Sequence, residues 1–181
     1  MIKYVIDDTF VDQDRPDDIY GAERYLSCGC GNYVYLRFDI RDIDLFTLHE
    51  VEKVTVGIAV GFNNTSQKPY GFASIYPMAT WEDSFWQEET MTYNTRVKAG
   101  NVPLYEIYDI TFDLDRNLYF NVTNDFLRCV RMSYDYYSVM IYCTITNMNW
   151  PGYFYSKELN LDYPEYNNAA TPALAIKYQP K

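Results

Sequence analysis

Apolar and polar residues alternate along several short stretches of the chain. The clearest stretch is 33–40, with the sequence YVYLRFDI, in which every second residue is apolar. Because side chains along a strand point alternately to its two faces, this pattern predicts a strand with one face in the core. The core side consists of Val34, Leu36, Phe38 and Ile40, and the outward side consists of Tyr33, Tyr35, Arg37 and Asp39.

Similar extended stretches recur over the whole chain. They cover 2–11, 25–27, 51–62, 72–76, 90–93, 106–114, 118–122, 139–145, 153–159 and 174–178. Loops rich in Gly, Pro and Asn separate them, residues 42–50 suggest a helical turn or a loop, and no stretch has a convincing amphipathic helical pattern. About ten short strands at even spacing predict an all-β, two-sheet β-sandwich with jelly-roll topology, formed by residues 1–181 as one domain.

Charge narrows the classes of partner. The chain has 15 lysines and arginines against 25 aspartates and glutamates, which gives a net charge of −10. Nucleic-acid binders need clustered cations to meet phosphates, so this balance argues against a nucleic-acid partner. There is also no apolar run long enough to span a membrane and no targeting segment.

The residues available for catalysis are few. His49 is the one histidine, and no nucleophile elbow accompanies it. The four cysteines lack the spacing of a zinc site, and buried thiols are their expected state. Carboxylates flank the tryptophans at Glu82, Asp83, Glu88 and Glu89, which leaves a glycan lyase or hydrolase as the last-ranked alternative. We therefore expect that the protein is not an enzyme.

The high content of tyrosine, 20 residues in 181, is the feature of the composition that says most about possible partners. Amphipathic aromatic side chains are enriched where proteins meet partners or stack on sugar rings, although many also fill strands by β-propensity. Trp86 is expected to be a buried packing residue. The candidate ligand-binding residues are Tyr33, Tyr35, Trp81, Tyr153 and Tyr155. Their partner is either a polysaccharide or another protein.

An aspartate-rich run lies near the N-terminus, in the sequence DDTFVDQDRPDD. It lacks the order and the fixed glycine of an EF-hand loop. Its oxygen ligands are nevertheless of the kind that a hard cation prefers. Asp8, Asp12, Asp14 and Asp17 are therefore candidate ligands of a structural Ca²⁺, the alternative being a solvated loop that needs no cofactor.

Several motifs, in order, resemble the DNRLRE (disaggregatase-related) domain. They are DTFV at 8–11, PDDIYG at 16–21, YLRFDI at 35–40, WQEETMTYN at 86–94, YDIT at 108–111, FYSKE at 154–158 and TPALAIKY at 171–178. Tyr93 stands where the family has a second Trp, and Arg96 lies near its usual Pro. The resemblance implies a β-jelly-roll with a non-catalytic role, akin to a family of carbohydrate-binding modules, which in some members bind polysaccharides such as alginate.

These observations lead to a functional expectation. We expect a non-catalytic adhesion or decoration module of a larger assembly, in which other proteins and polysaccharides are the partners. The module makes up the whole sequence and no export signal is visible, and both features favour a phage virion surface protein. Such a protein would be assembled into the capsid or tail in the host cytoplasm. The alternative is a stand-alone polysaccharide-binding module of a secreted, extracellular bacterial protein.

Overall fold

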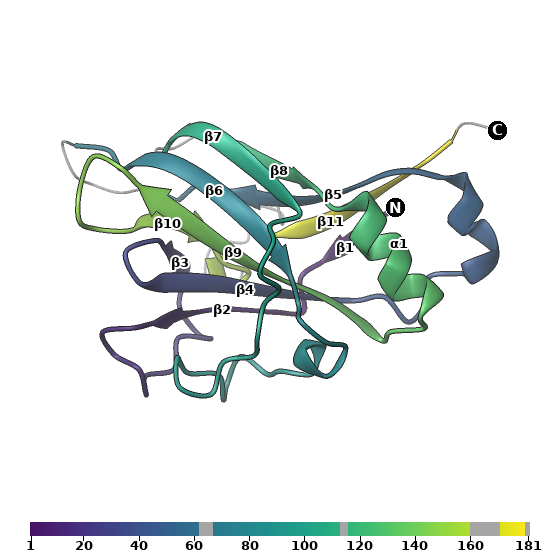
Figure 1. Cartoon of the computed structure of the whole chain (residues 1–181), viewed down its shortest axis with the longest axis horizontal. Coiled ribbons are helices and arrows are strands. Elements are labelled where there is room, and N and C mark those ends of the chain that lie inside the picture. Colours follow the sequence, from purple (N-terminus) through teal and green to yellow (C-terminus); the bar gives the residue numbers. More distant parts are fainter. Residues whose placement is uncertain (62–66, 113–115, 160–170, 180–181) are drawn as a thin grey trace.

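The computed structural model describes residues 1–61, 67–112, 116–159 and 171–179 (Figure 1). Its strands follow the alternating stretches of the sequence closely. They are β1 (Ile2–Tyr4), β2 (Asp7–Asp12), β3 (Tyr25–Cys28), β4 (Asn32–Asp39), β5 (Val51–Ala59), β6 (Tyr70–Pro77), β7 (Tyr105–Thr111), β8 (Asn117–Asn121), β9 (Tyr136–Ile145), β10 (Gly152–Tyr155) and β11 (Ala173–Tyr178).

The strands form antiparallel sheets that pack face to face. One sheet has the order β2-β4-β9-β6-β7, and the other has the order β1-β11-β5-β8. The pair β10-β3 meets the second sheet through a bridge between Phe154 and Val60, just beyond the end of β5. The predicted all-β sandwich is thus confirmed, whereas its jelly-roll topology stays a prediction.

The core lies between the two sheets. On β4, Val34, Leu36 and Phe38 are fully buried, as their alternation predicts. They belong to one large apolar cluster with inward residues of β5, including Val54 and Val56. Burial of this kind is the main favourable contribution to folding.

A second apolar cluster lies on the outer face of the five-stranded sheet. It comprises Val11, Tyr35, Met78, Trp86, Met91 and Met140. Residues 78–101, here called the covering segment, run across this face between β6 and β7 (Figure 1). Trp86 in this segment is 5% exposed, which confirms that it is a packing residue. Residues 90–93, expected to be extended, form no strand within the covering segment.

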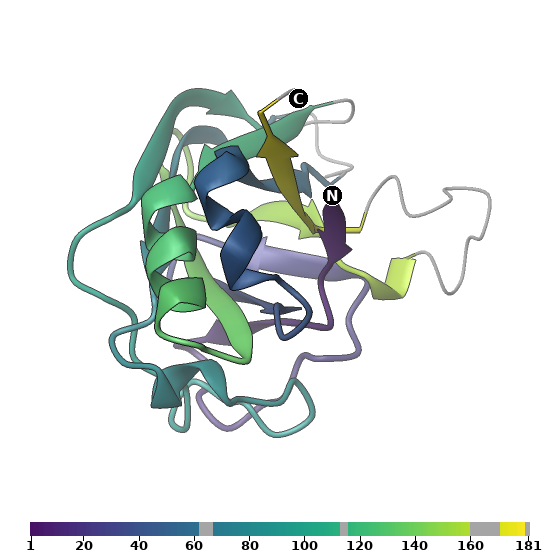
Figure 2. The same ribbon diagram turned by 90° about the vertical axis from the view of Figure 1, so that its right-hand side faces the viewer.

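The sequence prediction missed one helix, α1 (Thr123–Arg131). Its buried side is formed by Phe126, Cys129 and Val130, which recur at helical spacing over less than three turns. Of the two alternatives expected for residues 42–50, a helical turn or a loop, the structure has a helical turn, η1 (Leu45–Glu50). It lies beside α1 at one end of the sandwich (Figure 2). A second short turn is η2 (Glu82–Ser84). None of the helices among the described residues is long and apolar enough to cross a membrane.

Candidate functional site

The outer face of the five-stranded sheet carries a row of aromatic side chains. Tyr33 on β4 and Tyr142 on β9 stack, with ring centroids 5.0 Å apart and an interplanar angle of 25°. The ring of Tyr93, from the covering segment, lies 6.2 Å from that of Tyr33. Tyr33 and Tyr142 remain only partly buried, so the row presents aromatic surface beside the covering segment.

The covering segment is held by its own hydrogen bonds. The amide of Ala79 donates to the carbonyl of Lys98 at 2.9 Å, which brings the two ends of the segment together. Between them, the Asp83 carboxylate accepts hydrogen bonds from the Thr80 amide and hydroxyl and from the Lys98 amide. These contacts give the segment a defined position over the sheet.

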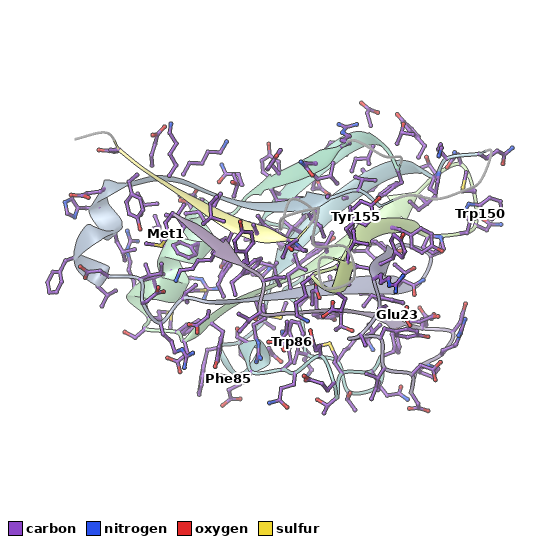
Figure 3. The ribbon with its side chains drawn as sticks, turned by 180° about the vertical axis from the view of Figure 1, so that it is seen from behind. Met1, Glu23, Phe85, Trp86, Trp150 and Tyr155 are labelled. Atoms are coloured by element: carbon purple, nitrogen blue, oxygen red, sulfur yellow. The ribbon has the colours of Figure 1, made fainter. Side chains whose placement is uncertain are left out.

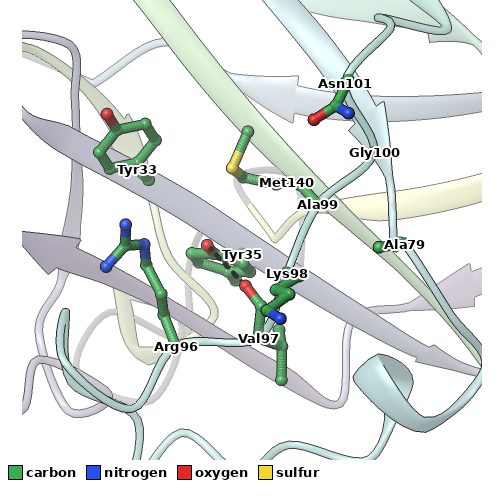
Figure 4. A pocket seen from close by; sticks show the side chains of 10 residues that line it. All are labelled: Tyr33, Tyr35, Ala79, Arg96, Val97, Lys98, Ala99, Gly100, Asn101 and Met140. Atoms are coloured by element: carbon green, nitrogen blue, oxygen red, sulfur yellow. Dashed lines mark hydrogen bonds between the residues drawn. The ribbon is translucent and has the colours of Figure 1, made fainter.

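A groove of about 810 Å³ lies where the covering segment meets the sheet (Figure 4). Its floor comes from β4 and β9, and its wall comes from residues 96–101 of the covering segment. The lining residues are Tyr33, Tyr35, Ala79, Arg96, Val97, Lys98, Ala99, Gly100, Asn101 and Met140. The groove is partly open to solvent.

Two cations line this groove in a protein of net charge −10. The Arg96 guanidinium lies 3.6 Å from the ring centroid of Tyr93, and it also donates to the carbonyl of Tyr93. Within the described ranges, neither Arg96 nor Lys98 forms an ion pair with a carboxylate. Both positive charges therefore lack a carboxylate counterion among the described residues, and the Arg96 guanidinium is held in place by Tyr93.

The candidate ligand-binding residues separate into different places. Tyr33 and Tyr35 both line the groove, but Tyr35 is 1% exposed because the covering segment lies over it. Its hydroxyl donates to the carbonyl of Val97, and burial raises its pKa, so the phenol stays protonated at neutral pH. Tyr35 therefore holds the groove wall, and the partly buried Tyr33 ring lines the groove. The Arg96 guanidinium lies 5.9 Å from the centroid of the Tyr33 ring.

The other candidate aromatic residues lie outside the groove. Trp81 is 50% exposed and meets Phe85 edge to face at the η2 turn. Tyr153 and Tyr155 lie on β10, in the pair with β3, where the rings of Tyr155 and Tyr25 are 5.6 Å apart. Figure 3 shows Tyr155 well separated from Phe85 and Trp86. The five candidates thus do not form one site.

Sequence reasoning missed several residues of the groove and of the aromatic row beside it. Tyr142 belongs to that row, and its outward position follows from the alternation within 139–145, so its place on the same face as Tyr33 could have been predicted. Arg96, Lys98 and Asn101 lie in a loop without periodicity, and only the path of the covering segment brings them to the sheet. No local pattern marks these three.

The catalytic candidates are placed away from the groove or are engaged in structural contacts. His49 is exposed at the end of η1, where its Nε2 lies 3.9 Å from Glu50. Asp83 binds the covering segment as described above, and both Glu88 carboxylate oxygens contact the Lys157 ammonium. The four thiols are free; three are buried, whereas Cys30, expected to be buried, is exposed in a turn between two glycines.

The aspartates of the candidate Ca²⁺ site do not gather. Asp12 accepts a hydrogen bond from the Asp14 amide, and Asp17 accepts one from the Asn94 side chain at 2.7 Å. Among the described residues, Asp12, Asp14 and Asp17 belong to no group of carboxylates close enough to share a cation. Asp8 does, but its companions are Glu88 and Glu158.

The surroundings of Asp8 are unusual for a carboxylate. Its side chain is fully buried, and its Oδ2 accepts a hydrogen bond from the Lys157 amide at 2.8 Å. The Lys157 ammonium lies 3.8 Å from Asp8 Oδ1 and 2.6 Å from a Glu88 oxygen. Burial and the charge of Glu158 raise the pKa of Asp8, although Lys157 opposes them.

No protein-family model matches the chain, and a search of curated proteins finds no relative. The resemblance to the DNRLRE domain therefore remains a hypothesis that rests on the motifs. The fold brings three of these motifs together, because Asp8 of DTFV, Glu88 of WQEETMTYN and Glu158 of FYSKE lie in one cluster.

Proposed function

We propose that this protein is a non-catalytic adhesion module of a larger assembly, and that it binds an acidic glycan in the groove beside the covering segment. The observation that carries the proposal is the combination of an open aromatic floor with two cations that have no carboxylate partner. Tyr33 supplies the floor, and Arg96 and Lys98 supply the charges.

The chemistry of this lining suits a sugar chain. The exposed part of the Tyr33 ring offers apolar surface to sugar C–H groups, while the amide of Asn101 can bond hydroxyls. Arg96 is suited to carboxylates because its planar guanidinium can donate two parallel N–H hydrogen bonds to the two carboxylate oxygens. A uronate-containing polysaccharide combines both kinds of group.

The composition of the groove supports a non-catalytic role. None of the described residues that line it carries a carboxylate, an imidazole or a thiol. Acid–base hydrolysis of a glycoside commonly uses two carboxyl groups that flank the scissile bond. The lining thus favours binding over turnover.

We propose two settings in which this module could act. On a phage virion, many copies would engage a surface polysaccharide together, and multivalency makes a weak contact effective. A module of a secreted bacterial protein would use the same groove in fewer copies. Immunodetection of the chain in purified virions distinguishes these settings.

Affinity electrophoresis tests the proposed function. The protein is run through gels that contain a polyuronate, a neutral glucan or no polysaccharide. We expect retardation of the wild type by the polyuronate alone, and loss of retardation in Tyr33→Ala and Arg96→Gln. The matched control is Lys177→Gln, which removes a cation paired with Glu52 away from the groove and should migrate as the wild type does. Equal retardation of all four proteins, or none, contradicts the proposal.

A further inference from the structure

Three carboxylates from distant parts of the chain meet beside the N-terminal strand of the five-stranded sheet. Asp8 comes from β2, Glu88 from the covering segment and Glu158 from the residues just after β10. One carboxylate oxygen from each lies within 4.8 Å of the others. With Asp8 fully buried and the two glutamates partly buried, this is not a solvated acidic surface.

The cation within this cluster does not satisfy it. The Lys157 ammonium donates to both Glu88 oxygens and to Glu158. Asp8 Oδ1 is left 3.8 Å away, beyond hydrogen-bond distance, and it has no hydrogen-bond partner. One positive charge thus faces three carboxylates, and a fully buried oxygen aimed at the same position is unpaired. Such an oxygen is costly to bury.

We infer that Asp8, Glu88 and Glu158 form a binding site for a divalent cation of the size of Ca²⁺, which replaces the Lys157 ammonium between them. Oxygen ligands on opposite sides of one ion are separated by at most twice the ion–oxygen distance. That limit is about 4.6–5.2 Å for Ca²⁺ and about 4.0–4.2 Å for Mg²⁺. The three oxygens lie within 4.8 Å of one another, which is inside the Ca²⁺ limit, and the variable geometry of Ca²⁺ sites suits carboxylates from three separate segments.

The surrounding residues allow this exchange. The Lys157 side chain is 21% exposed, so its ammonium has a path to solvent. The hydroxyl of Ser156 contacts Glu158 at 3.0 Å and orients that carboxylate toward the cluster. The neighbouring carboxylate of Asp7 is already bound by the Arg37 guanidinium, which leaves the three-carboxylate cluster as the place with uncompensated negative charge.

Terbium luminescence tests the site, because Tb³⁺ binds where Ca²⁺ does and is excited through a nearby tryptophan. Trp86 lies two residues before Glu88. After treatment with EDTA, we expect saturable Tb³⁺ emission that Ca²⁺ suppresses and Mg²⁺ does not. Lys157→Gln removes the competing ammonium and should tighten Tb³⁺ binding at least about tenfold. A rise in melting temperature with added Ca²⁺ should accompany it.

Further variants locate the bound ion. Asp8→Asn and Glu158→Gln keep the shape of the side chains but remove ligand charge, so each should weaken Tb³⁺ binding at least about tenfold. Asp14→Asn, in the aspartate-rich loop, is the matched control and should bind as the wild type does. Unchanged affinity in the two cluster variants overturns the inference, as does emission that appears only in Lys157→Gln. If Asp8→Asn does not fold, Glu158→Gln decides alone.

Discussion

The hydroxyl of Tyr35, on β4, donates a hydrogen bond of 3.3 Å to the carbonyl of Val97, 62 residues later in the chain. This contact attaches the covering segment to the sheet at the point where the two enclose the groove. Because the ring of Tyr35 is buried under that segment, the two tyrosines on the outward side of β4 have different surroundings. Tyr35 belongs to a small second core, and Tyr33 faces the groove.

Tyr35→Phe tests this attachment. The substitution keeps the ring but removes the donor, and the Val97 carbonyl loses its partner. We expect the free energy of unfolding to fall by about 1 kcal/mol, measured by urea denaturation. Tyr119→Phe, at a tyrosine that is 61% exposed, is the control and should be neutral. Equal stability of the two variants would show that the hydrogen bond contributes nothing.

Phe126→Ala tests the packing of α1. Phe126 is fully buried and meets Tyr137 edge to face, with ring centroids 5.6 Å apart. Truncation of a buried phenylalanine costs about 3–5 kcal/mol, so the melting temperature should fall by many degrees. Asn124→Ala, on the exposed side of the same helix, should change it little. A small effect of Phe126→Ala would mean that α1 does not pack as described.

Gly71→Ala tests the close approach of β6 and β9. A Cβ atom at Gly71 would lie 1.8 Å from the carbonyl oxygen of Thr144, and backbone cannot yield as a side chain does. We expect a loss of about 3 kcal/mol or more, or failure to fold. At Gly57 the nearest atoms are those of the exposed Tyr119 ring, so Gly57→Ala should be far milder. Circular dichroism melts of both variants measure the difference.

Thiol modification has an expected pH dependence. Cys30 is exposed, whereas Cys28, Cys129 and Cys143 are buried. Burial, together with Cys28, raises the pKa of Cys30, and burial raises the pKa of Cys129 to about 12. Only the thiolate reacts, so modification of Cys30 should accelerate about tenfold per pH unit and should still be rising near pH 9.

Mass spectrometry after iodoacetamide treatment measures this reaction. We expect one modified residue in the native protein and none in Cys30→Ser. Modification of a second cysteine without denaturant would contradict the described burial. A rate that levels off below about pH 8 would contradict the direction of the pKa shift.

The strands were predictable because their pattern is local. A residue such as Leu36 is apolar since every second position of β4 faces the core, and this rule needs no knowledge of the partner strand. Helix α1 was harder, because its short apolar side adjoins the alternating run of β8. The sequence pattern at its apolar positions is therefore also compatible with the end of a strand.

The groove was less predictable because it depends on the path of a loop. The outward position of Tyr33 followed from alternation, but the cover over Tyr35 follows from where residues 78–101 cross the sheet. In the same way, Asp8 stood out within an aspartate-rich run, yet its companions come from residues 80 and 150 positions away. Contacts at such separations have no signature in a single sequence.

We propose that the groove between the covering segment and β4 binds an acidic glycan. Titration of the ¹⁵N-labelled protein with an oligouronate, followed by amide chemical shifts, tests this binding most directly. We predict saturable shifts concentrated at residues 33–35, 96–101 and 140–142, and their loss in Arg96→Gln. Saturable shifts that cluster instead on β10, or an unchanged spectrum at millimolar ligand, would contradict the claim.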